Sequence, residues 1–334
     1  MIRFFWALAA FVILCGCGAN ANKKMAENLS FLAESESAAP GDVMTEAPLG
    51  DFDADSAYMY LARQVAFGPR VPNTQAHKNT GDWLVGELNR HGLRVMEQKT
   101  KLKAFDGTIL DSRNIFAQIN PEVKDRVLLL AHWDSRPWAD KDPDPQKHNE
   151  PVDGANDGAS GVAVLLEISR QLAINPLDKG IDILLVDAED WGTDGDDESW
   201  ALGTQYFVQN PPVKGYSPKY AILLDMVGGE NATFCREYFS ERSAPLIAEQ
   251  IWQTAKKLGY AKYFKDRMGS AVMDDHVELI KAGIPAIDII DYRPEESGFN
   301  PRWHTTSDNL DGISKETLQA IGKTLITFLR QGNS

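Results

Sequence analysis

Short apolar runs that alternate with longer helical patterns constrain the fold of this chain most. Each run is rich in β-branched or aliphatic residues and is followed by a stretch with helical spacing of apolar residues. The segment Val127-Leu128-Leu129-Leu130 is apolar without interruption, which indicates a strand buried on both faces. Such an alternation predicts an α/β fold, with a mostly parallel, twisted central sheet and helices on both faces.

The expected elements can be placed by length and composition. Strands are expected at 113–119, 126–131, 181–186, 220–224 and 284–290. Helices are expected at 55–67, 74–92, 158–172, 202–209, 244–258 and 314–329. No internal repeat is visible, and 334 residues with 43% hydrophobic content suffice for one large core. We therefore expect a single domain over 52–334.

The start of the chain has the features of an export signal. Met-Ile-Arg precedes an apolar run over 4–14, which is shorter than the roughly 20 residues that span a bilayer. Leu14-Cys15-Gly16-Cys17 resembles the bacterial lipobox, in which the last Cys is acylated after cleavage. We expect a signal peptide with lipobox at 1–17 and a membrane anchor through lipid on Cys17. Ordinary secretion with a coincidental Cys17 is the alternative.

The lipobox resemblance implies a place in the bacterial cell envelope. Gly18, not Asp, follows Cys17, which favours the outer membrane or periplasm over the inner membrane. Residues 18–51 are rich in Ala, Ser, Glu, Asn and Pro and predict a flexible tether. Once Cys15 leaves with the signal and Cys17 carries lipid, only Cys235 remains, so no internal disulfide is expected.

The net charge of the chain restricts the kinds of molecule that it can bind. The net charge is -14, and no run of Lys or Arg rises above the acidic background. This argues against a nucleic-acid or anionic-membrane surface and favours cationic or neutral small partners. The sequence leaves the oligomeric state open.

Polar residues follow the expected strands directly, where ligands bind in open α/β sheets. Each residue alone is explained as a helix cap or a loop residue; Asp157 before Gly158 is an example. Together, they would repel one another without a cation. Imidazole mixed with carboxylates favours zinc, with three protein ligands and one open position. The residues are His132, Asp134, Asp187, Glu189, Asp190, Asp225 and His304.

Six motifs occur in the order found in the zinc aminopeptidase superfamily, and they look most like the animal-type glutaminyl cyclases and their bacterial relatives. A double acid before His276 and a Trp directly before His304 favour a cyclase over a peptidase. The similarity covers roughly 57–329. The motifs are Ala131-His132-Trp133-Asp134, Gly154-Ala155-Asn156-Asp157-Gly158-Ala159, Val186-Asp187-Ala188-Glu189-Asp190, Leu223-Leu224-Asp225-Met226, Met273-Asp274-Asp275-His276 and Trp303-His304-Thr305.

The resemblance implies a fold, a reaction and a site. It implies a glutaminyl-peptide cyclotransferase, which converts the N-terminal glutamine of peptides or proteins to pyroglutamate and releases ammonia. One zinc ion would be held by Asp157, Asp190 and His304. Glu189 would be the general base and acid, Asp225 would hold the substrate amino group, and Asp274 would complete a hydrogen-bonded carboxylate network.

A zinc aminopeptidase of the same fold is the alternative. It would use two zinc ions, and His132 and Asp134 match the position of the second metal in dinuclear peptidases. In cyclases that position is expected to be vacant, which leaves His132 to support the ligands. The family more often has Glu where Asp190 stands, so it stays open whether Glu189 or Asp190 reaches the metal. A non-catalytic peptide-binding lipoprotein is a third hypothesis, opposed by the intact Glu189, Asp157 and His304.

Aromatic and acidic segments complete the candidate site. Trp200 and Trp303 are expected as pocket walls, and Trp133, Trp138 and Trp191 are further candidates. The acidic loop 139–153 either overhangs the entrance and attracts cationic peptide N-termini or is a solvated insertion. The acidic stretch 192–199 could bind calcium, although its spacing matches no strict loop motif. Met273 replaces a polar residue of the animal enzymes, so the pocket wall there is expected to differ.

Overall fold

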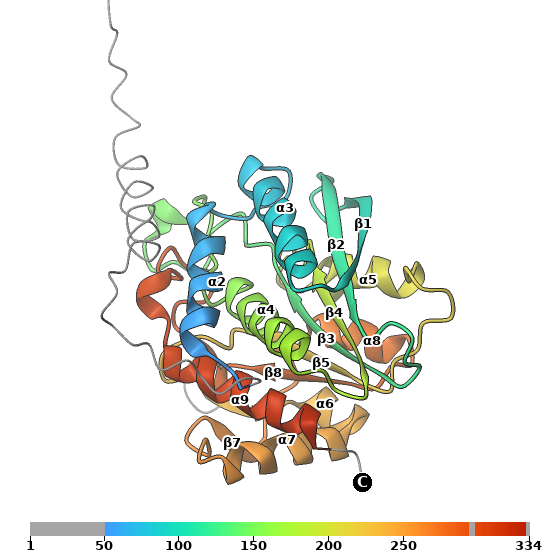
Figure 1. The fold of residues 1–334 in the computed structure, drawn as a ribbon. Helices are drawn as coiled ribbons and strands as arrows, with labels where there is room; N and C mark the ends of the chain where they lie inside the picture. The colour runs from blue at the N-terminus through green and yellow to red at the C-terminus, as the bar shows by residue number, and fades with distance from the viewer. Residues whose placement is uncertain (1–50, 294–297, 332–334) are drawn as a thin grey trace, which may run out of the picture. The chain divides into compact units, whose positions relative to one another are not determined.

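A six-stranded mixed sheet runs through the computed structural model, which describes residues 51–293 and 298–331 (Figure 1). The four strands β4, β3, β5 and β8 run parallel, whereas β1 and β2 are antiparallel at one side. The predicted α/β class with a mostly parallel sheet is confirmed. In spatial order the strands are β1 (Arg94–Lys103), β2 (Ile109–Ile119), β4 (Gly180–Val186), β3 (Arg126–His132), β5 (Ala221–Asp225) and β8 (Ala286–Ile290).

The central strands are buried on both faces, as their uninterrupted apolar sequences predict. Because successive side chains of a strand point to opposite faces, Val127 and Leu129 pack in one core while Leu128 and Leu130 pack in the other. All four side chains are inaccessible or nearly so. The sheet is therefore the middle layer of a three-layer molecule.

Helices cover both faces of the sheet (Figure 1). The larger core contains side chains of α2, α3, α4, α7 and α9, and the smaller core contains side chains of α5 and α8. A short α6 packs against β8. The bounds are α2 (Ala54–Ala66), α3 (Gln75–Arg90), α4 (Ala159–Ile174), α5 (Leu202–Gln209), α6 (Tyr238–Ser243), α7 (Pro245–Lys257), α8 (Asp275–Lys281) and α9 (Lys315–Arg330).

The strongly periodic helices and the apolar strands agree with the sequence-based expectations, while several short or exposed elements were not predicted. The edge strand β1 is polar and largely exposed, so it lacks the apolar signal of the core strands. The unpredicted elements are β1, α6 and α8, the small strands β6 (Phe234–Arg236), β7 (Phe264–Met268), β9 (Tyr292–Arg293) and β10 (Gly298–Phe299), and the 3₁₀ turns η1 (Pro145–Lys147), η2 (Asp197–Ser199) and η3 (Leu310–Gly312).

The predicted signal peptide with Cys17, and the tether up to residue 50, lie outside the described residues. Within the described ranges, Cys235 is a buried free cysteine. The helices of those ranges include none with both the length and the apolarity needed to cross a bilayer.

Candidate metal centre and pocket

The carboxyl ends of three neighbouring strands deliver the polar residues of the site. His132 is the last residue of β3, Asp225 is the last residue of β5, and Glu189 and Asp190 follow β4 closely. Since β3 lies between β4 and β5 in the sheet, these residues meet at one edge, as the sheet topology requires. Asp157 joins them from the loop before α4.

Asp157, Asp190 and His304 form one group whose ligand atoms all lie within 4.8 Å of one another. The Nε2 atom of His304 is 3.2 Å from Asp190 Oδ1 and 3.8 Å from Asp157 Oδ2. The other ring nitrogen of His304, Nδ1, faces Asp140 Oδ1 at 3.4 Å. Two carboxylates and an imidazole whose second nitrogen faces a further carboxylate are a donor set that fits zinc. The structure thus brings together the three predicted ligands.

Glu189 and Asp190 differ in their positions in the site. Asp190 belongs to the group with Asp157 and His304, whereas Glu189 lines the adjoining pocket and is absent from that group. Ala188, directly before them, has a positive φ of 56°, and a non-glycine residue in this region is typical of functional sites. The backbone N–H groups of Glu189 and Asp190 both donate to the Asp134 carboxylate, at 3.2 Å each. Asp134 therefore orients this turn.

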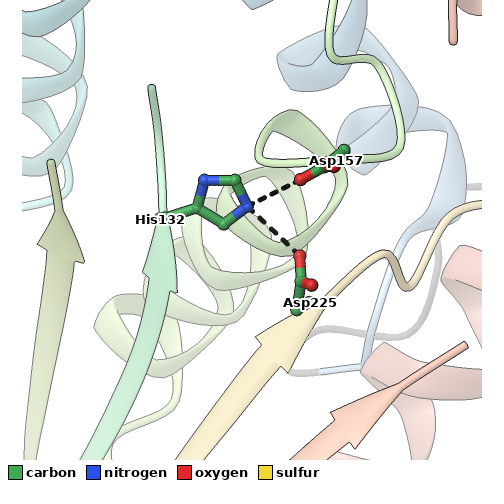
Figure 2. A group of neighbouring side chains, drawn as sticks. All are labelled: His132, Asp157 and Asp225. Atoms are coloured by element: carbon green, nitrogen blue, oxygen red, sulfur yellow. Dashed lines mark hydrogen bonds and ion pairs between the residues drawn. The ribbon is translucent and has the colours of Figure 1, made fainter. Parts of the chain in front are cut away.

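A second group lies beside the first and shares Asp157 with it. Figure 2 shows the His132 ring between two carboxylates, with Nε2 at 3.0 Å from Asp157 Oδ1 and 3.2 Å from Asp225 Oδ1. Its Nδ1 is 3.5 Å from Asp134 Oδ1. Burial alone lowers the pKa of His132, but hydrogen bonds to Asp134, Asp157 and Asp225 outweigh burial and raise that pKa well above its usual range. The pair His132 and Asp134 thus adjoins the first group, as predicted.

The pocket beside these groups is a cleft of about 250 Å³. Glu189, Asp225 and Asp274 line it together with the first group. Trp303 stacks on His304, with ring centroids 3.7 Å apart, and Trp200 lies nearly parallel to His304 at 6.1 Å. Both predicted tryptophans therefore line the pocket, and so does Met273.

The electrostatics of the pocket favour protonation of Glu189. Burial is the main cause that raises its pKa well above the usual range, and the charges of Asp274, Asp190 and Asp275 add to it. Asp187 is not among the main causes of this shift. Asp187 instead accepts hydrogen bonds from Ala188 and Arg113 backbone and pairs with His77 at 2.9 Å.

A third group lies deeper, next to the pocket floor. Asp274 caps α8 by accepting from the backbone N–H of Asp275, and its Oδ2 atom is buried without a hydrogen-bond partner. Asp274, His276 and Asp288 have ligand atoms within 4.8 Å of one another. Glu237 accepts a hydrogen bond from His276 Nε2 at 3.1 Å. Asp274 therefore lies in a carboxylate-rich cluster, although no hydrogen bond joins it directly to Asp225 or Glu189.

Three residues that support the site escaped the sequence analysis. The Asp308 carboxylate accepts the backbone N–H groups of Asn156 and Asp157, at 2.8 and 3.0 Å, and so positions one ligand. Arg136 donates to the backbone oxygen of Asp190 at 3.0 Å. Asp140 faces His304. Asp308 lies three residues beyond the last motif, Asp140 belongs to the acidic loop 139–153 without being singled out there, and Arg136 lies in the irregular loop after β3.

The remaining candidates lie elsewhere. Trp133 is buried and stacks on His77, while Trp138 and Trp191 contact each other edge to face and do not line the pocket. The loop 139–153 is held to the site, since Lys141 donates its backbone N–H to His304 O at 3.1 Å. Within the described part of the chain, none of the possible metal-binding groups includes a residue of 192–199.

A sheet whose carboxyl edge carries buried His and carboxylate groups beside a cleft defines a metal-dependent enzyme of the zinc exopeptidase fold. Residues 114–329 match the peptidase family M28, and the chain belongs to this zinc-dependent family of enzymes. The relatives of this chain include both peptidases and glutaminyl cyclases.

The relatives cover both activities. The chain is 52% identical to the glutaminyl cyclase of Porphyromonas gingivalis, with a TM-score of 0.83 over 85% of this chain and 99% of that chain. It is also 52% identical to a Zn-dependent exopeptidase of Parabacteroides distasonis, with a TM-score of 0.83 over 85% of this chain and 100% of that one. Aminopeptidase YwaD of Bacillus subtilis is 32% identical over 263 residues, or 76% of this chain. The chain spans 52% of the length of YwaD.

Proposed function

We propose that this protein is a zinc-dependent glutaminyl-peptide cyclotransferase, which converts N-terminal glutamine of peptides to pyroglutamate and releases ammonia. One observation carries the proposal: Glu189 lines the same cleft as the convergent group of Asp157, Asp190 and His304. The likeness to the Porphyromonas gingivalis glutaminyl cyclase, at 52% identity, supports this choice of reaction.

Asp157, Asp190 and His304 would hold a single zinc ion. When bound, zinc supplies polarisation of the substrate γ-carbonyl and stabilises negative charge on its oxygen. Asp140 keeps His304 in position through Nδ1, Asp308 holds the Asp157 loop, and Arg136 holds the Asp190 backbone. These contacts set the ligand geometry before the substrate arrives.

Glu189 would transfer the protons of the reaction. The α-amine of the substrate attacks its own γ-carbonyl carbon, so a ring N–C bond forms and the bond to the amide nitrogen breaks. Glu189 takes a proton from the attacking amine and delivers it to the leaving nitrogen, which departs as ammonia. This shuttle requires a carboxyl group with a pKa near the working pH, and burial beside Asp274 and Asp190 raises the pKa of Glu189 in that direction.

Other pocket residues would select the cyclising conformer. Because both reactants belong to one residue, the enzyme mainly needs to hold them in the attacking geometry. Asp225, which is 8% exposed at the end of β5, would hold the amino group. Trp200 and Trp303 offer flat apolar walls for the carboxamide, and Asp274 lines the same cleft as Asp225.

An aminopeptidase is the second candidate, supported by the group of His132, Asp157 and Asp225 and by the similarity to YwaD. In this alternative the group holds a second zinc ion, and Glu189 deprotonates a water molecule. We prefer one metal because the resemblance to glutaminyl cyclases implies a single zinc ion; without a second ion, His132 Nε2 lies 3.0 and 3.2 Å from the Asp157 and Asp225 carboxylates and can donate to them.

The two candidates release different products. We expect the purified protein to release ammonia and a pyroglutamyl peptide from a Gln-initiated peptide, and to leave a Leu-initiated peptide intact. Metal content measured on the same sample should approach one zinc per chain. Free leucine without ammonia, together with two metal ions per chain, would show that the aminopeptidase is correct.

Replacing the proposed base gives a test within the site. Glu189→Gln should lower kcat by roughly 100-fold or more, as for loss of a general base, while zinc content stays at the parent level. Glu249→Gln on the exposed face of α7 is the matched control and should keep the parent rate. Full activity in Glu189→Gln would remove this residue from the mechanism.

A further inference from the structure

The cleft is acidic from floor to rim. Asp194 and Asp197 line it in addition to the five acidic residues described above, and no Lys or Arg of the described residues is part of its lining. On the floor, Asp274 is 7% exposed and its Oδ2 atom has no hydrogen-bond partner. The exposed carboxylates of Asp194 and Asp197 carry the charge that a cationic ligand would meet at the mouth of the cleft.

The rim carboxylates differ in how they are paired. Asp194 pairs with Lys141 at 2.6 Å, and Glu198 pairs with Lys281 at 3.1 Å. Within the described part of the chain, no hydrogen bond or ion pair engages the Asp197 side chain. Asp197 is therefore the rim acid whose charge is left for a ligand.

The loop that carries Asp197 is held in a defined position relative to the catalytic groups. Ser199 Oγ accepts from Thr193 N at 2.9 Å and donates to Asp196 O, which closes the loop on itself. Trp200 donates Nε1–H to Thr193 O at 3.2 Å and lies parallel to His304. Because the loop backbone is fixed before binding, less conformational entropy is lost when a ligand contacts Asp197.

The rim already accommodates one ammonium group. Lys141 Nζ lies 5.7 Å from the centroid of the Trp303 ring while it pairs with Asp194. An indole face beside a carboxylate is a favourable environment for a cation. Lys141 thus makes the kind of contact, with a carboxylate beside an indole ring, that we expect a cationic substrate side chain to make at the neighbouring Asp197.

We propose that Asp197 selects substrates with Lys or Arg directly after the N-terminal residue. The first residue occupies the floor, where Glu189, Asp225 and Asp274 lie. The second follows at roughly 3.5 Å along an extended chain, so its side chain reaches the rim. Only the identity of the first residue as glutamine rests on the proposed function, because the cleft and its charges serve either reaction.

The kinetic test compares Gln-Lys- with Gln-Glu-initiated peptides that are otherwise identical. The parent enzyme should have a higher kcat/KM for the lysine peptide, and Asp197→Asn should reduce the ratio of the two values by about three- to tenfold, as expected for loss of one charge contact. Asp196→Asn is the matched control: it removes the same charge from the same loop, but Asp196 does not line the cleft. Its ratio should stay within about twofold of the parent, since exposed charges at a distance are screened.

A binding test separates this proposal from the reaction. In the Glu189→Gln background, which should bind peptides without turnover in either reaction, the Lys peptide should quench tryptophan fluorescence with a lower Kd than the Glu peptide. Adding Asp197→Asn should bring the two Kd values together. The role of Asp197 would be overturned if the two peptides had equal Kd values in Glu189→Gln alone. It would also be overturned if Asp196→Asn reduced the preference for the Lys peptide as much as Asp197→Asn does. If the parent enzyme releases no ammonia from either peptide while the Kd preference is intact, only the cyclase reaction is overturned.

Discussion

At the scale of single residues, the ligands of the candidate centre depend on side chains that lie outside it. His304 has a positive φ of 54°, a conformation that costs free energy for a non-glycine residue. Each nitrogen of its ring nevertheless faces a carboxylate, Asp190 at Nε2 and Asp140 at Nδ1. The loop residue Asp140 therefore influences metal affinity without being a ligand.

This arrangement predicts the effect of removing the Asp140 charge. Asp140→Asn should weaken zinc binding by about 10- to 100-fold, because a neutral amide orients the imidazole less firmly and lowers its basicity. Competition with a chelator would measure the change. Asp144→Asn in the same loop, an exposed cap of η1, is the control and should bind zinc like the parent; equal weakening in both variants would point to the loop as a whole.

A second residue-scale prediction concerns acid stability. His91 is buried between Tyr60 and Ser169, and burial lowers its pKa from 6.5 to about 4. Between these two pH values His91 is protonated in the unfolded chain and neutral in the folded chain. Its contribution to stability is therefore fully present above pH 6.5 and is lost as the pH falls toward 4.

His91→Gln should reduce the difference in the free energy of unfolding between about pH 7 and pH 5. Urea unfolding at both pH values would measure it, with His148→Gln as control. The variant will also lose stability at pH 7 through its broken hydrogen bonds, so the difference between the two pH values is the informative quantity. An unchanged difference would exclude His91 as a source of the pH dependence.

At the scale of elements, close packing of α4 on the sheet depends on a missing side chain. A Cβ atom at Gly161 would overlap the carbonyl oxygen of Leu224 and press on Ala131. The helix therefore approaches β3 and β5 more closely than any other residue would allow. This approach places Asp157, just before the helix, next to Asp225.

Two helical glycines should respond to alanine with opposite signs. Gly161→Ala should destabilise the fold by roughly 1–3 kcal/mol through overpacking. Gly86→Ala on α3 meets no atom within 4 Å and should stabilise it by up to about 1 kcal/mol through helix propensity. Urea unfolding would measure both, and a stabilised Gly161→Ala would show that α4 can move away from the sheet.

At the scale of the whole molecule, several separate chain segments bring buried acidic side chains to one edge of the sheet. Burial and neighbouring carboxylates raise the pKa values of Asp190, Asp225 and Asp274 in the metal-free chain. Burial likewise raises the pKa of Asp275 to about 7 and that of Asp308 to about 7. Raised pKa values mean that the folded chain binds more protons than the unfolded one, so the metal-free form loses stability as the pH rises.

Metal removal should therefore lower Tm, and more strongly at about pH 8 than at about pH 6, because a divalent ion replaces protons that are lost at higher pH. Differential scanning calorimetry with and without chelator would measure the two shifts, and added zinc should restore the original Tm. A shift that is larger at pH 6 would contradict the assigned position of the buried charges.

Sequence patterns were sufficient for the elements with long apolar periodicity. Burial on both faces makes a strand such as 126–131 uniformly apolar, and a long helix such as 314–329 shows its buried stripe. Edge strand β1 gave no such signal, because it is solvated. The same limit applies to α8, whose seven residues span only two turns.

The sequence by itself determined the residue types of the site and their order along the chain, because strand ends in an α/β sheet share one edge and motifs that follow those ends must converge there. Only the tertiary structure decided which acids meet. It separated Asp190 from Glu189, turned Asp187 away to His77, and added Asp140 and Asp308 from loops without a pattern. The physical reason is that loop conformation and side-chain direction depend on contacts between segments far apart in the chain, and local sequence does not encode those contacts.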